Sequence, residues 1–240
     1  FLLKESKKIY ELTEGAFDPT IGPLVNAWGF GPLKKKNIPS KEEIDSIIKL
    51  VGFDKLYFDE TIIEKNHKDS YIDFSSIAKG YAVDELSNYL ISLDLFNHMV
   101  DIGGDVYCSG KNKSNNPWSI GIQYPQQDVH STVIDLILLS NKAVATSGNY
   151  RNRVVIDGIT YTHIINPKTG YPIDNNIVSA TVITDSCIIA DAYATALMVM
   201  GREKGKSFIE DKINAEAIIF FKDEGSIKSL QTSGFNDYEN

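Results

Sequence analysis

The chain has 240 residues, of which 42% are hydrophobic and 23% are charged, and its formal net charge is −8 at pH 7. This balance is typical of a globular protein and leaves no excess of Lys and Arg to replace the counterions of nucleic-acid phosphates. No apolar run reaches the roughly 18 residues that a membrane-spanning helix requires. Cys108 and Cys187 form neither a C-x-x-C pair nor a zinc-ligand spacing and are expected to be buried free thiols. We therefore expect no nucleic-acid partner and no transmembrane segment in this chain.

Apolar periodicity and turn residues divide the first 93 residues into helices, a hairpin and a loop. Residues 15–32 (GAFDPTIGPLVNAWGFGP) are punctuated by Gly and Pro, which predicts a structured loop. Ser40 followed by Glu43 is a capping-box signature and predicts the start of a helix. The helices are expected over residues 1–12, 40–52 and 76–93, with a hairpin over residues 55–66.

From residue 98 onward, short β-branched runs separated by turn residues predict a mostly antiparallel sheet. The runs cover residues 98–110, 118–124, 131–140, 143–148, 153–166 and 178–185. Two helices follow, one containing Asp191 and one near residues 201–212, and a hairpin over residues 216–231 ends the chain. Helices grouped around runs of strands indicate an α+β architecture. We find neither a repeat nor a long linker and expect one domain over residues 1–240.

Residues 190–201 (ADAYATALMVMG) combine an almost wholly apolar helical pattern with an aspartate near its start. Asp191 and Thr195 are four residues apart and therefore share one face of the helix. Two interpretations are open. Asp191 offsets the helix dipole while Thr195 bonds back to a carbonyl, or the two side chains supply oxygen ligands to a hard cation such as Mg²⁺.

Residues 71–80 (YIDFSSIAKG) carry polar side chains into the start of a predicted helix. Asp73, Ser75 or Ser76 would serve as helix caps. A cap does not explain Lys79, because a lysine is unfavourable near the positive end of the helix dipole. Exposed N–H groups at a helix start together with Lys79 favour a phosphate ligand.

Two further segments combine turn residues with groups that can bind a ligand. Gly103-Gly104 lies inside a strand-like run, which indicates either a β-bulge or close backbone approach to a ligand. His163 lies near the end of a strand, beside the polar loop Asn-Pro-Lys-Thr-Gly, which is also a good turn. The other histidines are His67, His98 and His130, and His163 is the one flanked by ligand-like loops. The combined groups suit a phosphate or pyrophosphate bound with Mg²⁺.

Six segments in this order resemble the ApbE family, the FAD:protein FMN transferases. They are GAFDPTIGPL, DFSSIAKGYAVD, VDIGGDVYCSG, ATSGNY, YTHIINPKTGYPI and ADAYATALMVMG, which together span residues 15–201. The resemblance implies an ApbE-like α+β fold and an enzyme that splits FAD. Its FMN half would pass through a phosphoester bond to a Thr or Ser hydroxyl of an acceptor protein, with release of AMP. Typical acceptors are flavin-carrying subunits of membrane redox complexes.

The resemblance also implies roles for particular residues of this chain. Mg²⁺ would be held by Asp191 and Thr195, helped by a backbone carbonyl near Ser76. His163 would be the catalytic base or a close partner of the reacting phosphate. The residues expected to contact FAD are Ala16, Phe17, Asp18, Asp73, Lys79, Gly103, Gly104 and His163.

The chain departs from the family pattern in three places. Many relatives carry a second Asp where this chain has Ala194, so a main-chain oxygen or water would replace that ligand. Relatives often have Gly-Gly where this chain has Ser75-Ser76, which matters little if the ligand there is a carbonyl. The family also has an N-terminal region that contributes to the flavin pocket, and residues 1–240 are expected to lack it.

Two alternative functions share the predicted FAD site. A hydrolase would pass FMN to water and give free FMN and AMP, whereas a non-catalytic protein would hold FAD without cleaving it. A base beside the pyrophosphate favours the enzymes over the binder. From the resemblance we also expect an extracytoplasmic, membrane-anchored lipoprotein in the full-length form.

Overall fold

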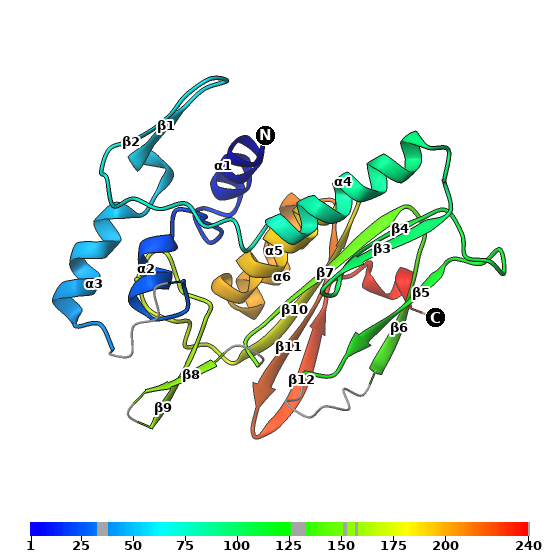
Figure 1. The fold of residues 1–240 in the computed structure, drawn as a ribbon. Coiled ribbons are helices and arrows are strands. Elements are labelled where there is room, and N and C mark those ends of the chain that lie inside the picture. The colour runs from blue at the N-terminus through cyan, green and yellow to red at the C-terminus, as the bar shows by residue number, and fades with distance from the viewer. Residues whose placement is uncertain (33–37, 126–132, 151–152, 157, 240) are drawn as a thin grey trace. The chain divides into compact units, whose positions relative to one another are not determined.

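The structure is a computed structural model and describes residues 1–32, 38–125, 133–150, 153–156 and 158–239 (Figure 1). The chain divides into two compact units. Unit 1 comprises Phe1–Ser75 and Asn152–Asp174, and unit 2 comprises Ser76–Arg151 and Asn175–Asn240. Each unit contains a hydrophobic cluster of its own. The single domain expected over residues 1–240 stays a prediction.

Unit 2 is built on a six-stranded antiparallel sheet with the strand order β12-β11-β10-β7-β4-β3. The strands are β3 (His98–Ile102), β4 (Asp105–Ser109), β7 (Lys142–Gly148), β10 (Ile177–Thr184), β11 (Glu216–Asp223) and β12 (Ser226–Gln231). Alternate side chains of a strand point to opposite faces of a sheet. Strands inside this sheet therefore contribute to two clusters, one on each face.

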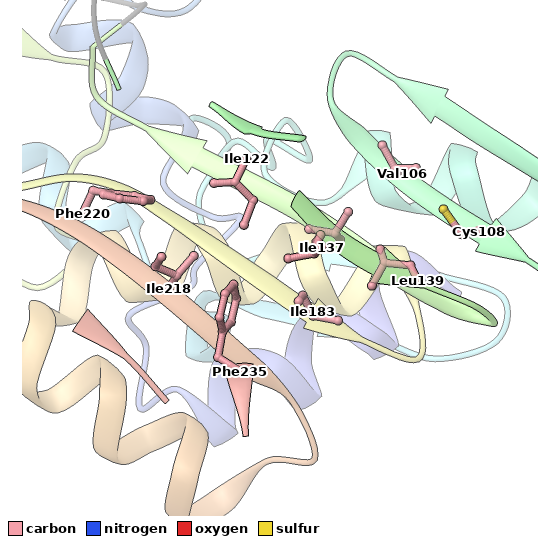
Figure 2. Close-up of a cluster of buried hydrophobic side chains, with 10 residues drawn as sticks. Val106, Cys108, Ile122, Ile137, Leu139, Ile183, Ile218, Phe220 and Phe235 are labelled. Atoms are coloured by element: carbon pink, nitrogen blue, oxygen red, sulfur yellow. The ribbon is translucent and has the colours of Figure 1, made fainter. Parts of the chain in front are cut away.

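One face of this sheet packs against the hairpin of β5 (Trp118–Gln123) and β6 (Val133–Leu139) and the short helix η3 (Phe235–Tyr238). Figure 2 shows the resulting cluster, in which Val106, Cys108, Ile122, Ile137, Leu139, Ile183, Ile218, Phe220 and Phe235 are labelled. None of these side chains is more than 5% exposed. Because burial of a large apolar side chain contributes about 2 kcal/mol, this cluster is a principal source of stability in unit 2.

The other face of the sheet packs against three helices (Figure 1). Helix α4 (Ala78–Ser92) lies on β3 and β4, α5 (Cys187–Met200) on β7 and β10, and α6 (Arg202–Lys212) on β11. Ala143 and Ala145 of β7 point to this face and pack with Val83 of α4 and Ala190 of α5. Strand β10 is buried along its whole length because both of its faces are covered.

Helices α4 and α5 approach each other closely at Gly80. A Cβ atom added to Gly80 would lie 2.3 Å from the carbonyl oxygen of Cys187 and 2.8 Å from the Cα atom of Ile188. Those are backbone atoms, so a larger residue would force the helices apart. The alanines of α5 are fully buried and keep its surface flat: Ala190, Ala192, Ala194 and Ala196.

The N-terminus of α5 is capped by a side chain from α4. The carboxylate of Asp84 accepts hydrogen bonds from the N–H groups of Cys187 (2.8 Å) and Ile188 (2.9 Å) and from the Ser186 hydroxyl (2.7 Å). These N–H groups are among those that a helix start leaves without a partner inside the helix. Asp84 therefore has the capping role that the sequence left open for Asp191.

Unit 1 consists of short helices and two hairpins. They are α1 (Leu2–Leu12), α2 (Gly22–Ala27), α3 (Lys41–Ile47), η1 (Ile48–Leu50), η2 (Phe53–Lys55), β1 (Leu56–Phe58), β2 (Ile63–Lys65), β8 (Arg153–Ile156) and β9 (Ile159–Thr162). Leu24, Trp28, Ile44 and Ile165 form one of its clusters. The predicted capping box is present, because Ser40 and Glu43 each accept a hydrogen bond from the other's backbone N–H.

The α+β class with a mostly antiparallel sheet is confirmed, and the predicted helices are present with shifted ends. The runs predicted at residues 98–110 and 153–166 each fold as two paired strands, β3 with β4 and β8 with β9. The loop predicted over residues 15–32 was partly wrong, because α2 lies within it and begins with Pro23 in its first turn. Cys108 and Cys187 are buried free thiols, as predicted. None of the helices in the described ranges has the length and hydrophobicity needed to cross a bilayer.

Replacing Asp84 by Ala should lower the free energy of unfolding by about 2 kcal/mol, because the α5 N-terminus loses a cap that accepts three hydrogen bonds. Urea unfolding followed by circular dichroism measures this change. The matched control is Glu85→Ala on the exposed side of α4, which should stay within about 0.5 kcal/mol of the unmodified protein. Equal losses in the two variants would contradict the capping role.

Candidate active site

In unit 2, a lysine lies between two buried aspartates at the junction of α4, α5 and β4. Lys79 Nζ lies 2.5 Å from Asp105 Oδ2 and 3.2 Å from each carboxylate oxygen of Asp191. The backbone N–H of Gly80 donates a further hydrogen bond of 3.2 Å to Asp191 Oδ2. Two residues of α4 thus hold the carboxylate of Asp191 in place.

Burial decides the electrostatics of this group. The side chains of Asp105 and Asp191 are 2% and 7% exposed, whereas that of Lys79 is 42% exposed. Burial, and then the nearby charge of Asp191, raise the pKa of Asp105 to about 7 even though Lys79 opposes the shift. Burial alone would lower the pKa of Lys79, but the two carboxylates raise it. Lys79 therefore stays charged and covers two carboxylates that repel each other.

Asp191 does not cap α5, the helix to which it belongs. Helix α5 begins at Cys187 and has no acidic residue in its first turn, so Asp191 lies in its second turn. The capping interpretation of Asp191 was wrong. Thr195 follows one turn later on the same face and is partly exposed on a helix that is otherwise largely buried.

The oxygen donors around Asp191 fit a hard cation held jointly with a substrate. Within the described ranges, no three side chains of His, Cys, Asp or Glu gather into a metal-binding group. Mg²⁺, however, is usually bound by one or two protein carboxylates together with substrate phosphates and water. The carboxylate of Asp191 and the hydroxyl of Thr195 match that pattern. Ser76, expected to help through a nearby carbonyl, lies in the turn that precedes α4.

Gly103 and Gly104 form the turn between β3 and β4. Their φ angles are +63° and +95°, and Ile102 pairs with Asp105 across the turn. Two consecutive positive φ angles are typical of a two-residue hairpin turn, in which glycine is favoured. The predicted β-bulge was therefore wrong. The turn places Asp105 at the first position of β4, and a Cβ at Gly103 would lie 3.9 Å from Lys79 Cδ.

In unit 1, Asp18 is a buried carboxylate with a local hydrogen-bond network. Its Oδ1 accepts hydrogen bonds from the backbone N–H of Thr20 (2.8 Å) and from the Thr20 hydroxyl (2.6 Å). The Thr20 oxygen in turn accepts a bond of 2.6 Å from the N–H of Gly52. Burial raises the pKa of Asp18 to about 6, against the opposite effect of the bonds from Thr20.

Asp73 lies beside the Asp18 segment. Its backbone N–H donates to the carbonyl of Pro19 (2.7 Å), and its Oδ1 accepts from the N–H of Ser75 (2.8 Å). The residue before α4 is Ile77, whose side chain makes no cap hydrogen bond, and the side chain that reaches this helix start is that of Asp191, through the N–H of Gly80. The capping interpretation of Asp73, Ser75 and Ser76 was therefore wrong.

Two of the residues predicted to contact FAD are buried in unit 1. Phe17 is 1% exposed and Ala16 is 8% exposed. The backbone N–H of Phe17 donates a hydrogen bond to the Thr13 hydroxyl oxygen (3.2 Å), which fixes the chain at this point. The FAD contacts of this segment stay predictions.

His163 directly follows β9 and precedes a firmly anchored loop. Its ring makes an edge contact with Phe30 at 6.3 Å between centroids. At the end of the loop, Gly170 has φ +77°, and its carbonyl accepts a hydrogen bond from Trp28 Nε1 (2.8 Å). A Cβ at Gly170 would lie 2.6 Å from a methyl carbon of Ile44. The catalytic role of His163 stays a prediction, and His130 lies outside the described residues.

The sequence interpretation missed Asp105 and Asp84 as partners of the site. Asp105 was visible only as one of two aspartates flanking a glycine pair. Its position at the start of a strand, on the face that carries α4 and α5, depends on the strand order. Asp84 is separated by 102–104 residues from the residues at the start of α5 that it contacts, so no local sequence pattern predicts these contacts.

Replacing Asp18 by Asn should stabilise the protein more at pH 7 than at pH 4. The folded-state pKa of Asp18 is raised from 3.8 to about 6, so its contribution to stability is present below pH 3.8 and lost as pH rises through 6. The neutral amide of the variant would carry no such penalty and would still accept the bonds from Thr20. The free-energy difference between the variant and the unmodified protein should grow by up to about 3 kcal/mol over this range.

Urea unfolding at both pH values measures the effect, with Asp45→Asn on the exposed side of α3 as the control for loss of one charge. If the difference in free energy of unfolding between Asp18→Asn and the unmodified protein is the same at both pH values, the raised pKa of Asp18 is contradicted.

Comparison with known proteins connects this geometry to a family. The family profile described as the ApbE family matches residues 1–219. A Vibrio cholerae protein named FAD:protein FMN transferase is 40% identical over 238 residues, which cover 99% of this chain and 71% of that protein. The Escherichia coli K12 protein of the same name is 35% identical over 246 residues, covering 99% of this chain and 68% of that protein.

Solved structures agree with the sequence relatives. Flavin transferase ApbE from Vibrio cholerae superposes with a TM-score of 0.88 at 40% identity, covering 98% of this chain and 75% of that chain. The ApbE protein of Thermotoga maritima has a TM-score of 0.88 at 36% identity, covering 100% and 77%. With the profile match over most of the chain, these similarities show that the chain belongs to the ApbE family.

Proposed function

We infer that this chain is an FAD:protein FMN transferase, which moves FMN from FAD to an acceptor protein. The observation that carries this conclusion is the 35–40% identity to proteins of that name over 99% of the chain. The residues on which the chemistry would depend are part of the same match. Members of this class are enzymes, so the chain is a transferase.

The detailed reaction that we propose is a phosphoryl transfer. The FMN phosphorus forms a bond to a Thr or Ser hydroxyl oxygen of the acceptor, and the phosphorus–oxygen bond to AMP breaks. The hydroxyl proton passes to a base, and AMP leaves with the electron pair of the broken bond. In such reactions, positioning and stabilisation of charge supply most of the acceleration.

Mg²⁺ is the proposed metal, with Asp191, Thr195 and a carbonyl near Ser76 as its ligands. When bound, Mg²⁺ would neutralise negative charge on the pyrophosphate. The support is the buried carboxylate of Asp191, which the N–H of Gly80 holds in place. Thr195 contributes the one partly exposed hydroxyl in this stretch of α5.

His163 is the proposed base. Its imidazole would accept the proton from the acceptor hydroxyl, because histidine exchanges protons near neutral pH. The edge contact with Phe30 and the anchored loop that follows restrict the position of its ring. Asp18 and Asp73 are the proposed FAD contacts on the neighbouring segments of unit 1.

The acceptor and the location are proposed from the family resemblance. A flavin-carrying subunit of a membrane redox complex is the proposed acceptor class. The proposed location is outside the cytoplasmic membrane, with the full-length protein anchored as a lipoprotein.

Incubating the chain with FAD, Mg²⁺ and a flavin-carrying redox subunit should add the mass of one FMN to that subunit. His163→Ala should lower the rate by at least about 100-fold, because a positioned base contributes about 10²–10⁴. Asp191→Ala and addition of EDTA should also abolish the adduct. Intact-protein mass spectrometry of the acceptor provides the measurement.

His67→Ala changes an exposed histidine of unit 1 and is the matched control, which should flavinylate at the unmodified rate. Free FMN and AMP with an unmodified acceptor would instead identify a hydrolase. Intact FAD throughout, despite measurable binding, would identify a flavin-binding protein without activity.

A further inference from the structure

Asp105 forms the shortest contact to Lys79 in the group of three charges, yet it belongs to none of the roles proposed above. Lys79 Nζ lies 2.5 Å from Asp105 and 3.2 Å from both oxygens of Asp191. The inference that follows rests on the proposed cation site at Asp191.

A cation bound to Asp191 would meet the ammonium group that already occupies its carboxylate. Lys79 contacts both oxygens of Asp191, so the lysine and a divalent cation would compete for the same ligand atoms. Like charges a few ångströms apart repel strongly where water is largely excluded. Lys79 therefore needs another partner if Asp191 is to bind the cation.

We propose that Asp105 is a positioning residue that retains Lys79 when Asp191 binds the cation. The carboxylate of Asp105 neutralises the lysine and holds it away from the oxygens of Asp191. Asp105 thereby favours cation binding indirectly, by holding Lys79, and is not itself a ligand of the cation.

The position of Asp105 suits this role. Its side chain is 2% exposed and is fixed at the first residue of β4 by the Gly103-Gly104 turn. The side chain of Lys79 passes beside that turn, with its Cδ 3.9 Å from where a Cβ of Gly103 would lie. The side chain of Lys79 is 42% exposed and its Nζ contacts both carboxylates, so it can keep one of them when the other binds a cation.

Removing Asp105 should therefore weaken cation binding only while Lys79 is present. In Asp105→Asn, Asp191 is the sole carboxylate partner of Lys79 in the group, so a cation that binds Asp191 leaves the charge of Lys79 unbalanced. We expect the affinity for Mn²⁺ to fall about tenfold, within the usual range for coupled sites. Lys79→Met removes the competing ammonium and should bind Mn²⁺ at least as tightly as the unmodified chain.

The decisive variant combines Asp105→Asn with Lys79→Met. It should recover Mn²⁺ affinity to within about threefold of the unmodified chain, because neither the unbalanced lysine nor its partner remains. Electron paramagnetic resonance of free Mn²⁺ measures the affinities, and urea unfolding verifies that each variant is folded.

The outcomes separate this inference from the proposed function. A double variant as weak as Asp105→Asn would overturn the positioning role, since a direct ligand or a purely structural residue is not rescued by loss of Lys79. A chain that binds no Mn²⁺, with or without FAD, would overturn both the cation site and this inference. The FMN adduct on the acceptor remains a separate measurement of transferase activity.

Discussion

The close approach of α4 and α5 at Gly80 is the constraint on which the site of unit 2 depends. The absence of a side chain at Gly80 brings the backbone of α4 against Cys187 and Ile188. Asp84 locks the same contact by capping α5. Lys79, next to Gly80 on α4, is thereby brought to Asp191. A wider separation of the two helices would break the contacts of both residues at once.

The charges in this site are arranged for binding rather than for stability. Two carboxylates and one ammonium leave an excess of negative charge in a largely buried place, and the raised pKa of Asp105 reflects that cost. Buried ion pairs stabilise proteins little, because loss of hydration offsets their attraction. Such a group at the start of α4, with the partly exposed Thr195 one turn after Asp191 on α5, suits a cationic ligand.

Local sequence patterns predicted much of the fold. Three patterns carry a physical signal that acts within a few residues: the capping box at Ser40, the short β-branched runs of the sheet and the apolar helix that contains Asp191. Helix α2 was hidden because it has only six residues, with Gly and Pro at its start. At Gly103-Gly104 the sequence left a β-bulge or a close approach to a ligand open, and the hairpin turn was missed because it depends on the pairing of β3 with β4.

The candidate site was predictable only in part. Spacing and flanking loops indicated Asp191, Thr195 and His163 as candidates, the family resemblance supplied their expected roles, and the fold shows why Asp191 is fixed in place. Asp105 reaches Lys79 because of the strand order, and Asp84 reaches α5 because of helix packing. Neither contact follows from the spacing of residues within a short stretch of sequence. The apparent misplacement of Lys79 near a helix start has a physical reason in Asp105 and Asp191, whose carboxylates compensate for the helix dipole.

The most direct test of the account is a crystal structure of the chain with FAD and Mn²⁺, in which anomalous scattering locates the metal. The account predicts a peak within bonding distance of the Asp191 carboxylate and the Thr195 hydroxyl, with Lys79 paired to Asp105 alone. A peak far from Asp191, or a lysine that still bridges both carboxylates beside a bound metal, would contradict it.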